Sequence, residues 1–331
     1  VKPPLRRRVK LPLPPPIEGS DSEPESEPPL PKPIPRIVLR RPVVPRVIEP
    51  PQPEQEQEQE QVARPARVQK NWASTITITY GDCAENHVGM QKMGQMATHG
   101  LTLKQLQTME SYFKSKGAKT ELIMLAEAGE LPEELQRPDT LDASVLIIRN
   151  GADIVLSQYD STSDDMYEEQ SFLEVDKKAK MKGRVVNKLA RHNLCFDEEG
   201  QEPCYEEGKG RVVAFRDVPL TDAIRDFFVG KLQLGALKAE GNYYYDRSCG
   251  IGWHGDSERK IVIAVRLGHS MPLHYRWYHN RQPVGEVVPL ILHHGDIYLM
   301  SAKAVGTDWK KYTQVTLRHA AGAAKYLAEK S

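Results

Sequence analysis

The stretch that most constrains this chain runs from Asn242 to Glu258 and has His254 and Asp256 at its centre. Side chains alternate along an extended strand, so residues two positions apart point to the same side. The imidazole of His254 and the carboxylate of Asp256 can therefore reach one metal ion. A site of two histidines and one carboxylate leaves positions on Fe(II) open for a co-substrate and dioxygen. A third ligand from elsewhere in the chain is then needed.

Proline content divides the chain into a tail and a folded part. Most of the 25 prolines lie before residue 70, with an arginine cluster, an acidic stretch and a Glu/Gln run. Proline removes backbone donors, and no apolar periodicity offsets the entropy cost of ordering this segment. Residues 1–70 are therefore predicted to be a disordered tail. It is either a solvated linker or a polyproline-like ligand for a partner protein.

Composition excludes few classes of function. The formal net charge is zero, so no overall basic field indicates nucleic acid, although a local basic groove would not appear in that sum. The four cysteines match no zinc pattern, and the chain has no signal peptide or apolar run long enough to span a bilayer. We therefore expect an intracellular protein, in the cytoplasm or nucleus, with free thiols and no membrane partner.

Residues 71–158 have the pattern of a small α/β domain of unknown role. Thr75–Tyr80 alternates β-branched and apolar residues, which is typical of a strand. Thr102 is placed to cap an amphipathic helix that ends at Gly117. Asn150–Gly151 stands between two apolar runs and predicts a hairpin.

Residues 160–174 are acidic and are expected to be a loop between domains, followed by a helix over residues 175–189. A second domain over residues 175–331 is predicted from a helix near Leu220–Leu232 and several short apolar runs separated by turn signals. Such runs favour an all-β sandwich or barrel. The expected strands are Val212–Phe215, Tyr243–Tyr245, Ile261–Leu267, Leu273–Tyr278, Val287–Leu292, Ile297–Met300 and Val315–Leu317.

Together these motifs resemble the AlkB-like branch of the Fe(II)/2-oxoglutarate-dependent dioxygenases. The segments that carry the resemblance are Asn242-x-Tyr244, His254-x-Asp256-x-Glu258 and the His-Gly-Asp strand over residues 294–300. The resemblance implies a double-stranded β-helix, also called a jelly roll, as the oxygenase domain. The expected fold class is therefore α+β, with the small α/β domain and the Pro-rich tail preceding the jelly roll.

The third metal ligand is expected to be His319, which lies 63 residues after Asp256. Its Arg-His-Ala-Ala segment is similar to the distal-histidine segment of prolyl-hydroxylase relatives. A competing alignment places Lys311 at the ligand position, and the metal site would then be broken, because an ammonium group cannot ligate until it is deprotonated. We favour His319.

The resemblance also implies Fe(II), 2-oxoglutarate as co-substrate, and dioxygen (O2). It points to Asn242 and Tyr244 for hydrogen bonds to 2-oxoglutarate. A guanidinium is the best chemical match to the far carboxylate of the co-substrate, and Arg318 is the candidate. Arg318 is adjacent to the proposed ligand and would face away from it on an ideal strand. Lys325 and Lys330 are the alternatives.

The implied reaction is hydroxylation or oxidative demethylation of a nucleic-acid base. Residues 191–196 and Tyr205 stand where AlkB relatives place a lid over a flipped nucleotide. The near-neutral charge and the His319 segment favour an alternative, a prolyl-type protein hydroxylase or small-molecule hydroxylase with a peptide, protein or small substrate. A second alternative is a catalytically inactive binding module that has lost a ligand.

Overall fold

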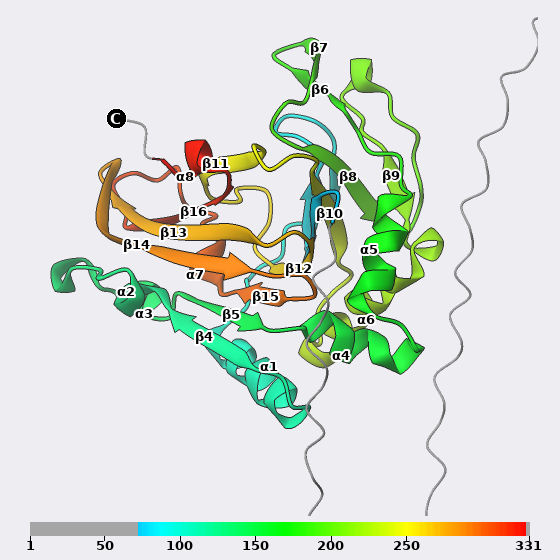
Figure 1. The fold of residues 1–331 in the computed structure, drawn as a ribbon. Helices are drawn as coiled ribbons and strands as arrows, with labels where there is room; N and C mark the ends of the chain where they lie inside the picture. Colours follow the sequence, from blue (N-terminus) through cyan, green and yellow to red (C-terminus); the bar gives the residue numbers. More distant parts are fainter. Residues whose placement is uncertain (1–71, 329–331) are drawn as a thin grey trace, which may run out of the picture. The chain divides into compact units, whose positions relative to one another are not determined.

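The computed structural model describes residues 72–328 (Figure 1). The predicted tail, residues 1–70, and Lys330 lie outside the described residues. The described chain is a mixed α and β fold rich in β-sheet. Between residues 72 and 328, no helix is both long enough and apolar enough to cross a membrane.

The larger layer is an eight-stranded sheet in which all neighbours are antiparallel except the last pair. Its spatial order is β4 (Thr120–Met124), β5 (Ser144–Ile148), β15 (Ile297–Met300), β12 (Val262–Gly268), β1 (Thr75–Gly81), β10 (Lys238–Tyr244), β8 (His192–Asp197) and β9 (Val212–Ala214). A second, four-stranded sheet has the order β11 (Gly250–His254), β16 (Thr316–Gly322), β13 (Met271–His279) and β14 (Gln282–Leu292).

Two small hairpins and the helices complete the described chain. The hairpins are β2 (Cys83–Glu85) with β3 (Lys92–Gly94), and β6 (Lys178–Met181) with β7 (Arg184–Asn187). The helices are α1 (Leu103–Ser115), α2 (Leu125–Ala128), α3 (Pro138–Leu141), α4 (Gly151–Leu156), α5 (Ser163–Ser171), α6 (Pro219–Leu232), α7 (Ala302–Val305) and α8 (Ala324–Leu327). Short 3-10 turns lie at Glu133–Leu135, Ser157–Tyr159, Tyr205–Glu207 and Phe215–Asp217.

The two faces of the large sheet pack into two separate cores. On one face, apolar side chains of α1, α4, α5 and α6 pack against the sheet (Figure 1). On the other face, side chains of β12 and β15 pack against those of β13, β14 and β16 from the smaller sheet. Successive side chains of β1 point to opposite faces of the sheet. Those of Ile76, Ile78 and Tyr80 lie in the core between the sheet and the helices, here called the helix-side core. The threonines of β1 therefore face the smaller sheet.

The two segments predicted as separate domains share one sheet. β1, from the first segment, pairs with β10 and β12 of the second, and β5 pairs with β15. The predicted boundary between residues 158 and 175 is therefore not a boundary of the fold. The physical reason is that strand pairing is non-local: β1 alone cannot bury its apolar side chains, and it does so only between two strands that come more than 150 residues later.

Three local predictions also differ from the structure. Asn150 adopts a left-handed conformation with φ of 51° and starts α4, so the Asn-Gly pair begins a helix rather than closing a hairpin. The acidic segment 160–174 contains α5, which Thr162 caps. The expected helix over residues 175–189 is the β6–β7 hairpin, because Lys182 and Gly183 both have positive φ, as a two-residue hairpin turn requires.

Several predictions from local pattern are confirmed. The strand at Thr75–Gly81 and the helix α6 at Pro219–Leu232 form as expected. Thr102 caps α1 through a capping box in which the side chain of Gln105 also accepts from the backbone of Thr102. The interactions that form these elements involve neighbours within a few residues, so the local sequence contains enough information to predict them.

Replacing Ile78 by Ala should destabilise the whole described unit. Ile78 is fully buried on β1, and a large-to-small change at such a site costs about 2–5 kcal/mol. Urea denaturation followed by tryptophan fluorescence and by far-UV circular dichroism should give one shifted transition. Val185→Ala, at an exposed position of β7, is the control and should change the free energy of unfolding by less than about 0.5 kcal/mol. Two separate transitions, with only one shifted, would restore the two-domain hypothesis.

Candidate metal and co-substrate site

Neighbouring strands of the smaller sheet bring His254, Asp256 and His319 together. His254 ends β11 and is directly opposite His319 on β16, and Asp256 follows in the next loop. The Nε2 atoms of His254 and His319 lie 3.5 and 3.6 Å from Oδ1 of Asp256. One ligand atom from each residue lies within 4.8 Å of the others. Two imidazoles and one carboxylate at this separation fit the donor set of a two-His-one-carboxylate metal site.

The two histidines present Nε2 toward Asp256. Nδ1 of His254 lies 2.7 Å from the carbonyl oxygen of Gly252, which holds the ring and leaves Nε2 for a metal. Burial, together with the nearby His319, lowers the pKa of His254 to about 3. Burial alone would raise the pKa of Asp256, but hydrogen bonding and charge from His319, with Arg259 and His254, hold it well below its usual range. Neutral His254 and ionised Asp256 are the forms that bind metal ions.

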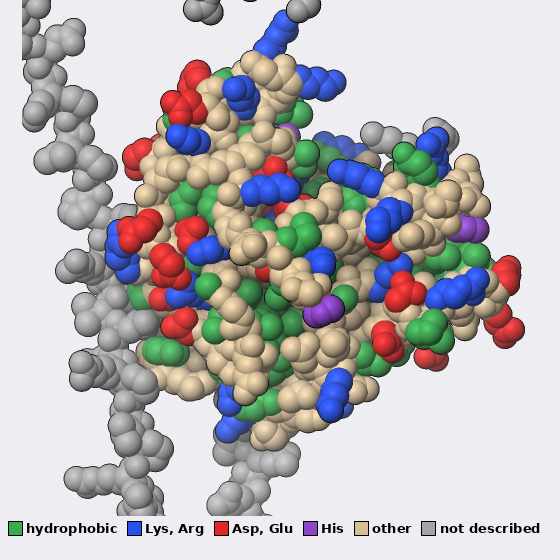
Figure 2. Space-filling view, turned by 180° about the vertical axis from the view of Figure 1, so that it is seen from behind, with side chains coloured by type: hydrophobic (Ala, Val, Ile, Leu, Met, Phe, Trp, Pro, Cys, Tyr) green, Lys and Arg blue, Asp and Glu red, His purple; other side chains and the backbone are tan. Residues whose placement is uncertain are grey.

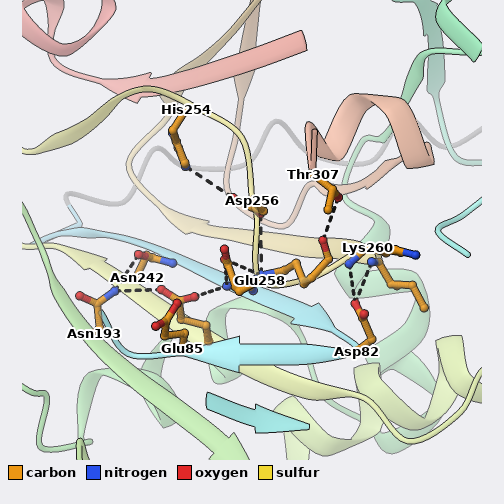
Figure 3. Close-up of polar contacts among 12 residues, drawn as sticks. Asp82, Glu85, Asn193, Asn242, His254, Asp256, Glu258, Lys260 and Thr307 are labelled. Carbon is orange, nitrogen blue, oxygen red and sulfur yellow. Dashed lines mark hydrogen bonds and ion pairs between the residues drawn. The ribbon is translucent and has the colours of Figure 1, made fainter. Parts of the chain in front are cut away.

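The loop that carries Asp256 is held by close backbone packing. A Cβ atom on Gly255 would lie 2.2 Å from the carbonyl oxygen of Gly306, so only glycine fits. The backbone N–H of Asp256 donates to Val305 at 3.0 Å. Further along the loop, Asp82 accepts from the backbone N–H groups of Lys260 and Ile261, each at 2.9 Å (Figure 3). The carboxylate of Asp256 is therefore presented by a fixed backbone.

A cavity of about 790 Å³ connects this triad to the large sheet. Its wall includes a row of residues that are opposite one another on adjacent strands: Asn242 on β10, Thr77 on β1 and Arg266 on β12. Tyr244 also lines the cavity, and burial raises the pKa of its phenol. The structure thus places Asn242 and Tyr244, the two residues predicted to contact the co-substrate, at the same cavity as the three candidate ligands.

Arg266 is the residue of this wall that the sequence reasoning missed. Its side chain is buried, and its Nε and Nη1 atoms have no hydrogen-bond partner, nor does Oγ1 of neighbouring Thr77. Within residues 72–328, no carboxylate lies at ion-pair distance from Arg266. A buried, unpaired guanidinium is costly unless a ligand compensates it. The cavity therefore fits an anion that places a carboxylate against Arg266 and Thr77.

The amide of Asn242 is oriented by its neighbours. Its Oδ1 accepts from Nδ2 of Asn193 at 2.8 Å (Figure 3). It also accepts from Nε of Arg191. Because the amide oxygen is occupied by these two donors, the amide NH2 group remains for a ligand in the cavity.

The prediction for Arg318 is corrected by its position. Its guanidinium lies over the ring of Tyr278, 3.9 Å from the centroid, and it does not line the cavity. Adjacent residues of a strand face opposite sides, so His319 toward the cavity places Arg318 away from it. Lys311, the competing ligand, is exposed and outside the cavity lining, as is Lys325 on α8.

Most of the predicted lid is part of the sheet. Residues 192–197 form β8, where Leu194, Cys195 and Phe196 are buried. The phenol of Tyr205 donates to Asp176 at 2.6 Å. Of the predicted lid, Arg191 and Asn193 line the cavity, and residues 187–190, at the end of the β6–β7 hairpin and directly after it, line it as well.

One signal in the sequence could have identified Arg266. The segment Val262–Gly268 reads Val-Ile-Ala-Val-Arg-Leu-Gly, so a single arginine interrupts an apolar strand. Ile263, Val265 and Leu267 enter the helix-side core, which leaves Arg266 on the other face. A charged residue in a buried strand is rare unless it is paired or binds a ligand.

Comparisons with known proteins identify a viral relative. No protein-family model matches the chain. The chain is 47% identical over 255 residues to "Uncharacterized protein R156" from Acanthamoeba polyphaga mimivirus, and the match covers 76% of this chain and 97% of the viral protein. This identity over nearly the full viral length exceeds what chance similarity produces. The chain therefore belongs to the same protein family as this mimiviral protein.

Proposed function

We propose that this protein is an Fe(II)- and 2-oxoglutarate-dependent dioxygenase, AlkB-like, that hydroxylates or oxidatively demethylates a nucleic-acid base. One observation carries the proposal: the ligand atoms of His254, Asp256 and His319 converge in one cavity whose opposite wall holds the unpaired Arg266. This combination provides separate places for a metal ion and for the far carboxylate of a dicarboxylic acid.

The strand arrangement supports the jelly-roll part of this proposal. The four-stranded sheet packs against side chains of β15, β12 and β10 on one face of the large sheet, and β1 lies between β12 and β10 in that sheet. Seven of these eight strands come from residues 238–322, and β1 is contributed from residues 75–81. β1 inserts between β12 and β10, so a strand far from the metal motif in sequence would complete the oxygenase sheet.

In the proposed site, His254, Asp256 and His319 hold Fe(II). Bound iron, with 2-oxoglutarate and O2, supplies the oxidation of a substrate C–H bond, coupled to decarboxylation of the co-substrate to succinate. Arg266 and Thr77 bind the far carboxylate of 2-oxoglutarate, a role that the sequence reasoning gave to Arg318. Hydrogen bonds from a guanidinium to a carboxylate are charge-assisted and are stronger than hydrogen bonds between neutral groups.

The charge of the segment that leads into the cavity rim supports a nucleic-acid substrate over a peptide. Residues 177–191 contain seven lysines and arginines and no acidic residue, and two of the seven, Lys188 and Arg191, line the cavity. This segment includes the β6–β7 hairpin, which projects from the top of the molecule, where Figure 2 shows Lys and Arg side chains with Asp and Glu side chains beside them. Cationic side chains of this kind attract the phosphates of nucleic acids. Val88 and Leu189, 78% and 82% exposed, add apolar contact area for a base at the same rim.

The proposal is tested by ligand binding and by turnover. Anaerobic addition of Fe(II) and 2-oxoglutarate should produce a weak visible charge-transfer band, and its absence would favour the non-catalytic binding module. Under aerobic conditions, succinate formation should rise when an N-methylated single-stranded oligonucleotide is added. An unmethylated oligonucleotide of the same sequence is the control. Stimulation by peptide alone would replace the nucleic-acid substrate by the protein-hydroxylase alternative.

A further inference from the structure

The two carboxylate oxygens of Asp256 face different partners. Oδ1 lies 3.5 and 3.6 Å from the Nε2 atoms of the two histidines. Oδ2 lies 3.8 Å from Nε of Arg259. One oxygen is thus directed to the candidate metal position and the other to a cation outside it (Figure 3).

Arg259 is itself held rigidly. It is 3% exposed and forms ion pairs with Glu240 and, at 3.0 Å, with Glu258. Its carbonyl oxygen accepts from the hydroxyl of Thr307 at 3.0 Å. The two carboxylates balance the charge of Arg259 and hold its guanidinium beside Asp256, while its Nη1 atom has no hydrogen-bond partner among residues 72–328.

The same ion pairs connect Asp256 to the co-substrate wall. Glu240, the partner of Arg259, also accepts from Nδ2 of Asn193 at 3.1 Å. Asn193 in turn donates to Asn242 at 2.8 Å. A chain of buried polar contacts therefore runs from the candidate metal ligand to the amide proposed to meet 2-oxoglutarate, and Arg259 is the link nearest the metal.

We propose that Arg259 is a positioning residue that keeps Asp256 a one-oxygen ligand. A carboxylate can bind a metal ion through one oxygen or through both. Binding through both would occupy a position that the keto acid or O2 requires at a three-ligand site. By holding Oδ2, Arg259 keeps that position available. This inference rests on the proposed function and assigns Arg259 a role that it exerts through Asp256.

The test uses Co(II) as the metal probe and separates metal binding from co-substrate binding. Arg259→Gln should weaken 2-oxoglutarate binding to the Co(II)-loaded protein by about 10–100-fold, the range for loss of a group that orients a metal ligand. Affinity for Co(II) alone should change much less, because Asp256 then binds through both oxygens. The visible absorption of bound Co(II), which reports its coordination, should differ from that of the wild-type protein before any co-substrate is added.

Arg225→Gln is a matched control. Arg225 is also largely buried and pairs with several acidic residues, among them Glu198 and Asp222, but it lies on α6 away from the cavity. This variant should lose stability and keep wild-type binding of both Co(II) and 2-oxoglutarate. Arg259→Lys retains the charge that Glu240 and Glu258 need, while lacking the guanidinium fork. It provides a folded variant in which the selective loss of co-substrate binding should persist.

Three results would overturn the inference. Wild-type affinity for 2-oxoglutarate in both Arg259 variants would remove the proposed role and leave the proposed function intact. Equal loss of affinity for Co(II) and for 2-oxoglutarate in the Arg259 variants would indicate that Arg259 has only a structural role. Failure of the wild-type protein to bind Co(II) would overturn the proposed function, and this inference with it.

Discussion

Replacing His319 by Ala should abolish the visible band of the anaerobic complex with Fe(II) and 2-oxoglutarate, and with it succinate formation. His319 is the ligand that β16 contributes opposite His254. Without it, two protein ligands remain, and the site loses one of the three donors that define it. Metal affinity should therefore fall by more than the 10–100-fold that loss of a supporting residue typically causes. Isothermal titration with Co(II) measures this loss directly.

His274→Ala is the control for this prediction. His274 lies on β13, next to β16, and is directly opposite Ala320 rather than His319. It does not line the cavity, so the variant should retain metal binding and the visible band. Survival of the band in His319→Ala would move the third ligand elsewhere, and loss of the band in both variants would attribute the effect to unfolding.

Arg266→Gln should separate co-substrate binding from metal binding. If Arg266 pairs with the far carboxylate, its removal leaves that charge buried without a partner. Breaking a buried ion pair in this way costs about 3–5 kcal/mol, which corresponds to a loss of affinity for 2-oxoglutarate on the order of 10²–10⁴-fold. Co(II) affinity should be nearly unchanged, because Arg266 is not paired with the metal ligands.

Two measurements make this prediction specific to Arg266. Arg318→Gln removes the arginine that adjoins His319 in sequence but stacks on Tyr278, and it should leave co-substrate affinity unchanged. The free energy of unfolding of the ligand-free Arg266→Gln protein should be unchanged or higher, because the variant removes an unpaired buried charge. A loss of 2-oxoglutarate binding in Arg318→Gln alone would assign the co-substrate to the other face of β16.

The local elements that the sequence predicted correctly are those whose physical cause is local. The capping box at Thr102 and the alternation in Thr75–Tyr80 involve neighbours within a few residues. The failures occur where one local signal is compatible with two structures. Asn150–Gly151 supplies a left-handed residue, which suits a hairpin turn and the start of α4 equally. The choice between them depends on packing by the rest of the chain.

The candidate site divides in the same way. Spacing in the sequence paired His254 with Asp256, and spacing together with the resemblance of its segment favoured His319 over Lys311; the structure brings the ligand atoms of all three predicted residues within 4.8 Å of one another. The assignment of Arg318 failed because strand alternation turns it away from the cavity. The sequence showed Arg266 only as an arginine within an apolar strand; its position in the cavity wall depends on the pairing of β12 with β1, which places Thr77 beside it.

By itself the sequence identified three residues whose side chains could bind a metal ion, and it predicted most of the strands that hold them. Periodicity and spacing are properties of the chain alone, and they can be read without knowing which strands pair. The tertiary structure decided that residues 72–157 share one sheet with the rest, and that Arg266 rather than Arg318 faces the candidate metal site. Both depend on which strands pair and in what register, and non-local hydrogen bonding and burial set that pairing.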